Sequence, residues 1–380
     1  MRRIPELDSI RGFAAVLILA YHLWTESVYF GWAAVNLFFV LSGYLITAII
    51  LRENRWPNFL LRFYARRSLR IWPIYYLTLA IVVAVALVRG GQGLDGLPYY
   101  LLYLQNVPHY YSGAVPKFPL SFFHTWTLAA EEQFYMIWPL MIALLGRAAV
   151  VPACLACLAA ATASRIAGFD DYLLLTNCDG FACGGLLAVL LADPGRVGVA
   201  RAGLRLAAVP LVALMVLVNF NLRGISPMIR RSLGLSQVAW QSLAEAGTNL
   251  FFMVAIGLIV LGSGRAALGW LRHRSLTHLG AISYGVYLYH WPIFLAVDAA
   301  AASLALPTAW WHAPVKVGLT FAAASLSWRF IEQPTLALKS RFDYRQGPAR
   351  VASAVVEAGA GPEGDVAGAV AGALCRPESA

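Results

Sequence analysis

A histidine and an arginine inside the first apolar stretch are the residues best placed to do chemistry. Residues 7–22 read LDSIRGFAAVLILAYH, with Asp8, Arg11 and His22 set among aliphatic side chains. Charged or titratable groups at membrane depth are costly, so each is a candidate functional residue. Arg11 and His22 are eleven residues apart, which on a helix returns to nearly the same face with roughly 16 Å of rise. One helix face therefore offers a cation near one end and, deeper inside, an imidazole that could serve as general base or acyl carrier.

Two adjacent glutamates give a second candidate group. Residues 126–135 read WTLAAEEQFY, which sets Glu131 and Glu132 within an apolar segment. If this helix enters the membrane near residue 125, the carboxylates lie about 9 Å deep, at a depth similar to that of His22. Neighbours on a helix diverge by about 100°, so we expect only one of them to charge or orient the imidazole, as a carboxylate does in hydrolytic triads. A buried hydrogen-bonded brace is the alternative for the other.

A basic segment precedes the third apolar stretch, and we read it as a loop. Within it, Arg67 and Arg70 stand three residues apart and close to Trp72, a spacing that places the two arginines on one face where the backbone is helical. Two guanidinium groups so placed can hold a phosphate in a forked geometry. The alternative is ordinary positive charge on a cytoplasmic loop.

Two further patterns concern helix faces. Ser283, Tyr287 and His290 follow a spacing of four and then three residues, so they share one helix face. The small pair Ser42 and Gly43 would let a neighbouring helix approach closely.

The composition requires elements that lie in a membrane. Hydrophobic residues make up 60% of the 380 residues and charged residues only 13%, which no ordinary soluble domain shows. We predict an all-α, polytopic transmembrane helical bundle of about ten spans. The spans fall near residues 10–28, 33–51, 71–89, 125–145, 149–167, 175–192, 203–221, 248–264, 280–300 and 312–331.

Basic residues gather in alternate connections, including the segment of Arg67 and the one around Arg196, and few lie in the others, where Arg231 is one of the exceptions. This asymmetry predicts that both termini are cytoplasmic. The formal charge of +10 is thus a topology signal, and we expect no nucleic-acid partner.

We expect a transmembrane domain over residues 1–340, with an uncleaved first span, and a low-complexity, disordered cytoplasmic tail over 341–380. The connection 90–124 is rich in tyrosine and could form either an interfacial belt or a platform for a sugar. The pair Cys154 and Cys157 lies in an apolar helix without a second cysteine pair or a nearby histidine, so we expect packing and no metal site.

Taken together, these motifs resemble the membrane-bound acyltransferase-3 family, whose members acylate polysaccharides, lipid-linked sugars, Nod factors and some macrolides. The resemblance runs from about residue 5 to 335. It rests on LDSIRG with a later histidine, FFVLSGYLI, R-x-x-R-I-x-P, W with EEQFY, Y-x-x-Y-x-x-H-x-P, and E-x-P. One position departs from the family pattern: Asn36 stands where an acid is common.

The resemblance implies an integral O-acyltransferase of the inner, cytoplasmic membrane. It implies cytoplasmic acyl-coenzyme A, usually acetyl-CoA, as donor substrate, with no permanently bound cofactor, and a carbohydrate or lipid-linked acceptor. It also implies His22 as the essential histidine, with Glu132 or Glu131 beside it, and Arg11, Arg67 and Arg70 as donor-binding residues. Supporting positions in the matched motifs are Asp8, Trp126, Gln133, Tyr135, Tyr287 and His290.

A transporter or flippase for a sugar- or lipid-linked substrate is the rival from another class, because buried charges can also line a substrate path. The arginine pair favours transfer chemistry, and the lack of internal repeats weakens the transport reading.

Overall fold

The computed structural model describes residues 3–25, 27–91, 94–107, 122–219, 225–307 and 310–344. Within these ranges every regular element is a helix and no strand occurs, which confirms the all-α prediction. Each predicted span overlaps one long helix, although several bounds differ by five residues or more. These helices are α1 (Pro5–Leu23), α2 (Ala34–Glu53), α3 (Phe59–Val88), α6 (Trp126–Leu145), α7 (Val150–Ile166), α8 (Leu174–Ala192), α9 (Val197–Asn219), α11 (Gln237–Gly262), α12 (Arg274–Ser303) and α13 (His312–Ser327).

Seven of the helical stretches in the described residues are long and apolar enough to cross a membrane. Helices α1, α12 and α13 are not among them. In α1 the reason is the presence of Glu6, Asp8 and Arg11 within 19 residues, and α13 has only 16 residues. The number of ten crossings and the cytoplasmic placement of the termini therefore stay predictions.

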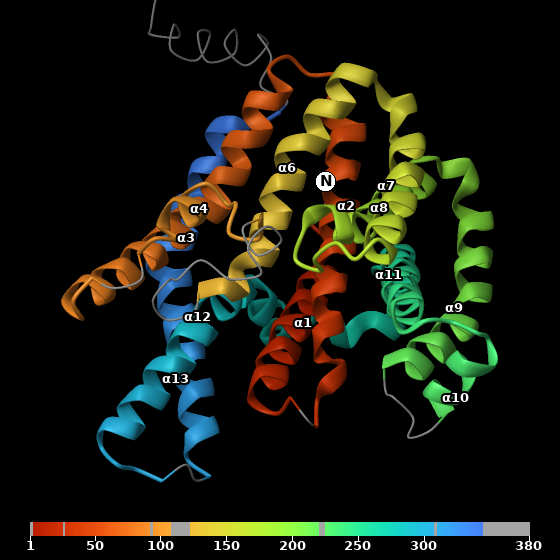
Figure 1. Ribbon diagram of the computed structural model, residues 1–380. Coiled ribbons are helices and arrows are strands. Elements are labelled where there is room, and N and C mark those ends of the chain that lie inside the picture. The colour runs from red at the N-terminus through yellow and green to blue at the C-terminus, as the bar shows by residue number, and fades with distance from the viewer. Residues whose placement is uncertain are drawn as a thin grey trace, which may run out of the picture.

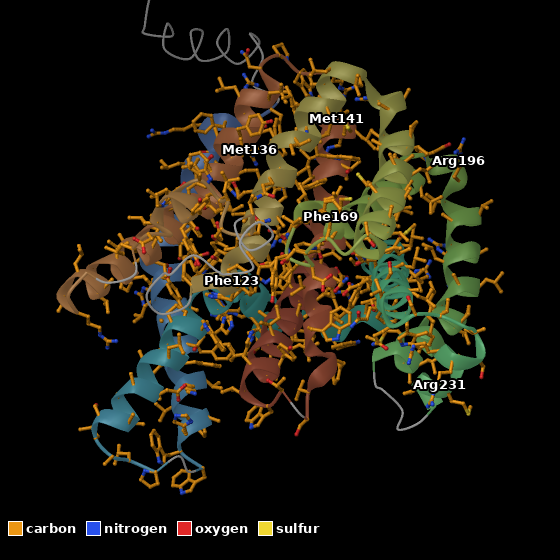
Figure 2. All side chains as sticks on the ribbon, in the orientation of Figure 1. Phe123, Met136, Met141, Phe169, Arg196 and Arg231 are labelled. Atoms are coloured by element: carbon orange, nitrogen blue, oxygen red, sulfur yellow. The ribbon has the colours of Figure 1, made fainter. Side chains whose placement is uncertain are left out.

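The helices form a bundle with different elements on its two sides (Figure 1). Helix α9, with the short α10 (Ile225–Ser232), forms one side, and the α12–α13 hairpin extends from the other. Arg196, just before α9, and Arg231, in α10, lie toward opposite ends of the side formed by α9 (Figure 2). The sequence assigned these two residues to opposite sides of the membrane.

Glycines at two helix crossings set how closely the helices pack. A Cβ on Gly280 of α12 would lie 1.9 Å from the backbone oxygen of Asp8 in α1, so the two backbones are in contact there. Helices α2 and α8 cross in the same way, because a Cβ on Gly43 would lie 2.0 Å from the backbone oxygen of Phe181. The expected close approach at Ser42 and Gly43 is thereby confirmed.

The basic segment before residue 71 is not a loop, contrary to the sequence reading. Helix α3 runs unbroken from Phe59 to Val88 and includes Pro73. Hydropathy marks a membrane span only from the point where the charged residues end. Arginine, leucine and alanine all have high helix propensity, so the helix itself begins earlier, within the charged residues. Arg67 and Arg70 therefore stand on a rigid element that continues into the membrane region.

The chain stays packed to Tyr344, four residues past the predicted domain boundary. After a π-helix (Trp328–Glu332) and the short α14 (Gln333–Ala337), a 3-10 turn (Leu338–Phe342) lies against α3. Arg66 donates a hydrogen bond to the backbone oxygen of Lys339 at 2.9 Å, and Arg62 donates to that of Tyr344 at 2.8 Å. The rest of the predicted tail, 345–380, lies outside the described residues.

Two tyrosines of the connection 90–124 point inward, whereas Tyr99 is 40% exposed. Tyr75 stacks on Tyr103 at 4.3 Å between ring centroids and donates a hydrogen bond to the backbone oxygen of Tyr100, in the short α4 (Leu97–Leu101). Both Tyr100 and Tyr103 are buried, so they brace the bundle and do not form a sugar platform. Residues 108–121 of this connection, with two of its tyrosines, lie outside the described residues.

Candidate active site

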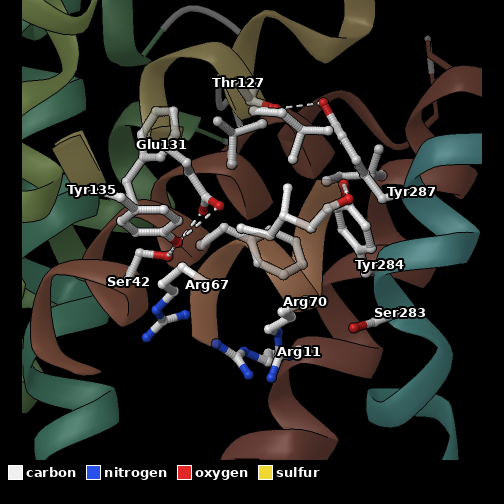
Figure 3. Close-up of a pocket in the computed structure, with 16 residues that line it drawn as sticks. Arg11, Ser42, Arg67, Arg70, Thr127, Glu131, Tyr135, Ser283, Tyr284 and Tyr287 are labelled. Carbon is white, nitrogen blue, oxygen red and sulfur yellow. Dashed lines mark hydrogen bonds between the residues drawn. The ribbon is translucent and has the colours of Figure 1, made fainter. Parts of the chain in front are cut away.

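An inner cavity of about 80 Å³ lies between α1, α2, α3, α6 and α12. Figure 3 shows Arg11, Arg67 and Arg70 gathered at one end of it and the pair Thr127–Tyr287 at the other. Glu131 lies between the two ends. The structure thus brings together the three arginines that the sequence singled out, although they come from two helices.

The same three arginines also line a larger cavity of about 590 Å³ at the end of the bundle where α1 begins. Asp8 stands at this cavity too, but its carboxylate pairs with Arg3 at 2.7 Å. Within the described chain no acidic side chain forms an ion pair with Arg11, Arg67 or Arg70. Three converging cations without a direct ion-pair partner repel one another, so the arrangement favours binding an anion.

Lys339 adds a titratable group to this arginine cavity. It lies after the last long helix, outside the candidate spans. Burial disfavours its charged form and the nearby guanidinium groups repel it, which together lower the pKa of Lys339 to about 6. The sequence offered no signal for this residue, because its position depends on the fold of the C-terminal turn over α3.

The two glutamates have different surroundings, as their helical offset requires. Glu131 accepts hydrogen bonds from Ser42 and from Tyr135, each at 3.0 Å, and lines the inner cavity. Glu132 turns to α3 and accepts a hydrogen bond from the indole of Trp72 at 3.2 Å. Glu131 is therefore the carboxylate that faces the arginines.

His22 sits near the other end of α1, in contact with α12. Its Nδ1 lies 2.9 Å from the backbone oxygen of Ile18, a contact in which Nδ1 donates and Nε2 keeps its lone pair. The ring centroid is 5.0 Å from that of His290 and 4.9 Å from that of Trp291. No carboxylate of the described residues hydrogen-bonds to this imidazole, so orientation by a glutamate finds no support in these contacts.

A second and a third histidine extend the group. His290 is fully buried, its Nδ1 is 2.5 Å from the backbone oxygen of Tyr287, and its Nε2 has no hydrogen-bond partner among the described groups. His124 lies 5.0 Å from His290, measured between ring centroids. The sequence did not assign His124 a role, although it opens the segment that carries the two glutamates.

Tyr287 separates the inner cavity from this histidine group. It lines the cavity, its hydroxyl is 2.5 Å from that of Thr127, and it also donates to the backbone oxygen of His124. His22 itself does not line the inner cavity. Tyr287 lines the inner cavity and its ring contacts that of His290, which in turn contacts that of His22.

Two of the expected supporting residues, Trp126 and Gln133, line none of these cavities. Trp126 packs against Tyr172 at 5.0 Å between ring centroids. Gln133 donates hydrogen bonds of 2.9 Å to Tyr103 and to Asn106, which ties α6 to the connection that follows α3. Both positions brace the elements that carry the site.

The position that departs from the family pattern is next to a carboxylate from another helix. Asn36 donates a hydrogen bond of 2.7 Å to Glu245 of α11 and one of 3.0 Å to Asn249. Glu245 thus places an acid beside the point where the sequence lacks one. Sequence reasoning missed it, since residues 36 and 245 come together only in the fold.

Beyond His22, a third cavity of about 400 Å³ opens at the end of the bundle opposite the arginine cavity. Tyr21 lines it, and the ring of Tyr21 is 5.2 Å from that of His22. Helix α1 therefore borders three cavities in turn, at Arg11, at Ile18 and at Tyr21.

Comparisons with known proteins find relatives over most of the chain. The chain is 28% identical over 369 residues to peptidoglycan O-acetyltransferase OatA of Listeria monocytogenes, covering 87% of this chain and 55% of that protein. It is 27% identical over 359 residues to O-acetyltransferase OatA of Staphylococcus aureus, covering 88% and 57% respectively. The chain thus spans about half the length of the curated relatives it matches. No solved structure matches it.

The family model described as an acyltransferase domain matches residues 4–329, which is most of the chain. The transporter alternative gains no support from these relatives. This chain belongs to the membrane-bound acyltransferase-3 family, a family of enzymes that transfer acyl groups.

Proposed function

We propose that this protein is a multi-pass O-acyltransferase of the inner membrane that moves an acetyl group from cytoplasmic acetyl-CoA to a hydroxyl of a carbohydrate. The observation that carries the proposal is the course of α1, which borders the arginine cavity, the inner cavity and the third cavity in succession. His22 lines neither of the last two cavities, but it contacts Ile18, which lines the inner cavity, and Tyr21, which lines the third. We infer that an acetyl group that enters among the cations reaches this imidazole past Tyr287.

The arginine cavity supplies the donor site. Coenzyme A carries several phosphate charges, and Arg11, Arg67 and Arg70 offer guanidinium donors without competing ion pairs in the described chain. Charge-assisted bonds of this kind contribute about 1.5–3 kcal/mol each. The roughly 16 Å of helix between Arg11 and His22 suits an extended pantetheine arm.

The chemistry centres on the free Nε2 of His22. As general base, it takes the proton of the acceptor hydroxyl while the hydroxyl oxygen attacks the thioester carbonyl. The tetrahedral intermediate then collapses, the carbon–sulfur bond breaks, and the proton passes to the leaving thiolate, giving an ester and free coenzyme A. Alternatively, Nε2 accepts the acyl group first and transfers it in a second step. Both routes need the same nitrogen.

The acceptor is proposed to be an envelope polysaccharide. Support comes from the relatives, one of which is named a peptidoglycan O-acetyltransferase. This chain spans only about half of such relatives, so their acceptor is not assigned to it directly. Peptidoglycan is therefore the first acceptor to test.

The proposal is tested with membranes that contain the full chain, incubated with acetyl-labelled acetyl-CoA. We expect label on envelope saccharide, and a loss of about 10²–10⁴-fold for His22→Ala, while donor binding stays within twofold. His312→Ala is a matched control, because that histidine pairs with Asp298 on the α12–α13 hairpin, away from the cavities. Full transfer by His22→Ala would defeat the assignment. Rapid acid quenching distinguishes the two routes, since only the second leaves label on the protein.

A further inference from the structure

The third cavity has a lining unlike that of the arginine cavity. It lies among α1, α7, α10, α11 and the connection between α1 and α2. Two guanidinium groups, Arg165 and Arg230, are matched there by two carboxylates, Asp171 and Glu245. The balance of charge argues against a polyanionic ligand such as the proposed donor.

Neutral donors and acceptors complete the lining. Gln237 and Gln241 of α11 contribute amide groups, and Trp32 and Tyr21 contribute aromatic faces. Hydroxyl groups of a ligand need partners that both donate and accept, which amides and carboxylates provide together. Aromatic rings offer flat apolar surface with a polar tip. This combination suits a ligand with many hydroxyl groups and an apolar ring face.

Two buried polar groups at the cavity have no protein partner among the described residues. Arg165 is 7% exposed, and its Nη2 donates to Asp179 at 2.7 Å, while its Nη1 has no hydrogen-bond partner. The hydroxyl of Ser242, at 4% exposure, has none either. Leaving such groups unpaired is costly, so both indicate that something polar binds in the space they line.

The cavity also has the right size and place for an acceptor. Its volume of about 400 Å³ falls in the range of small-molecule sites. Tyr21 connects it to the catalytic candidate, because Tyr21 lines the cavity and its ring touches that of His22. We propose that this cavity binds the acceptor as an uncharged, hydroxyl-rich saccharide unit, and presents one of its hydroxyls toward His22. The inference rests on the proposed function and assigns its second substrate a site.

The test fills the cavity without touching the donor site. Gln241→Trp places a large ring in the space, and Leu243→Trp is the matched control, because Leu243 lies on the same helix, is 39% exposed and does not line the cavity. Each full-length variant is expressed in cells that lack other O-acetylation, and the acetate released from the envelope fraction by mild alkali is measured. Binding of acetyl-CoA to the purified variants in lipid nanodiscs is measured in parallel.

We expect Gln241→Trp to lower envelope acetate at least tenfold with donor affinity within twofold of the unmodified protein. Leu243→Trp should change neither. The milder Gln241→Ala should raise the KM for saccharide several-fold and leave the KM for acetyl-CoA unchanged. Unchanged envelope acetate in Gln241→Trp would overturn the acceptor site alone. If the unmodified protein neither binds acetyl-CoA nor produces envelope acetate, the proposed function fails and the acceptor site fails with it.

Discussion

At the scale of single residues, the main feature is the positive charge of three arginines that form no ion pair with an acidic side chain of the described residues. Arg67 lies over the ring of Tyr135 at 5.2 Å, and together with Arg11 and Arg70 it faces two cavities. Arginines that served only to fix the orientation of the protein in the membrane would be expected to face solvent or to form ion pairs. Their convergence is therefore the residue-level feature that the donor hypothesis explains.

Removing one of these arginines should weaken donor binding selectively. We predict that Arg70→Ala raises the dissociation constant for acetyl-CoA by about 10- to 100-fold, the loss of one charge-assisted contact. Equilibrium binding to the purified protein measures it. Arg147→Ala is the control, because Arg147 lies at the same end of the bundle but hydrogen-bonds Asn54 at 2.7 Å outside the cavity. Equal affinities for the two variants would contradict the donor site.

Lys339 should make donor binding depend on pH. With the pKa of Lys339 lowered to about 6, its amine is neutral at pH 8 and becomes charged as the pH falls to 5.5. A phosphate-bearing donor then meets one more cation, so this residue's contribution to affinity rises toward acid pH and is lost as the pH rises through 6.

Titration of the donor's own phosphate, with a second pKa near 6, acts in the opposite direction. The prediction is therefore a difference between variants: relative to Lys339→Met, the unmodified protein gains about 3- to 10-fold in affinity between pH 8 and pH 5.5. Lys339→Arg, charged throughout, should bind more tightly than the unmodified protein at pH 8. Parallel pH curves for all three proteins would remove Lys339 from the site.

At the scale of helices, the crossing of α1 and α12 decides whether the histidines meet. Gly12 and Gly280 let the two backbones touch, and His22 and His290 follow ten residues later on each helix. Because both helices rise equally per residue, a contact at the glycines sets the distance at the histidines. The same two elements also carry Arg11 and Tyr287 to opposite ends of the inner cavity.

A single methyl group at this crossing should disturb the site from a distance. We predict that Gly280→Ala destabilises the fold by about 1–3 kcal/mol and lowers transfer, because its Cβ would lie 1.9 Å from the backbone oxygen of Asp8. Gly318→Ala in α13 meets nothing within 4 Å and should be neutral or stabilising by about 0.5–1 kcal/mol. Thermal unfolding in detergent and the transfer assay report the two effects. Normal activity in Gly280→Ala would show that the crossing does not set the site.

At the scale of the whole molecule, sequence patterns located the helices but not their partners. Apolar runs predict where a helix lies, since the membrane selects for them, and each of the ten expected segments overlaps a helix. They could not show that α3 begins at Phe59, because charges interrupt the apolar pattern and not the helix. Nor could they place Lys339 or Glu245, whose neighbours are remote in sequence. Arg11 and His22 became candidate functional residues because each is a titratable group inside an apolar run, where burial is costly.

The arrangement of the cavities gives the molecule two ends with differently charged linings. The arginine cavity is cationic, the third cavity balances its charges, and α1 connects them past Tyr287 and His22. This polarity predicts that donor and acceptor never need to enter from the same side.

The most direct test of that polarity is transfer by the purified full-length protein in liposomes of uniform orientation. The vesicles are sealed, so that labelled acetyl-CoA is supplied only to the face of the arginine cavity and a saccharide acceptor only to the other face. Vesicles that contain the His22→Ala protein are the control. The account predicts label on the saccharide in this arrangement, none when the two are exchanged, and none with His22→Ala. Transfer only when donor and acceptor share one face would contradict it.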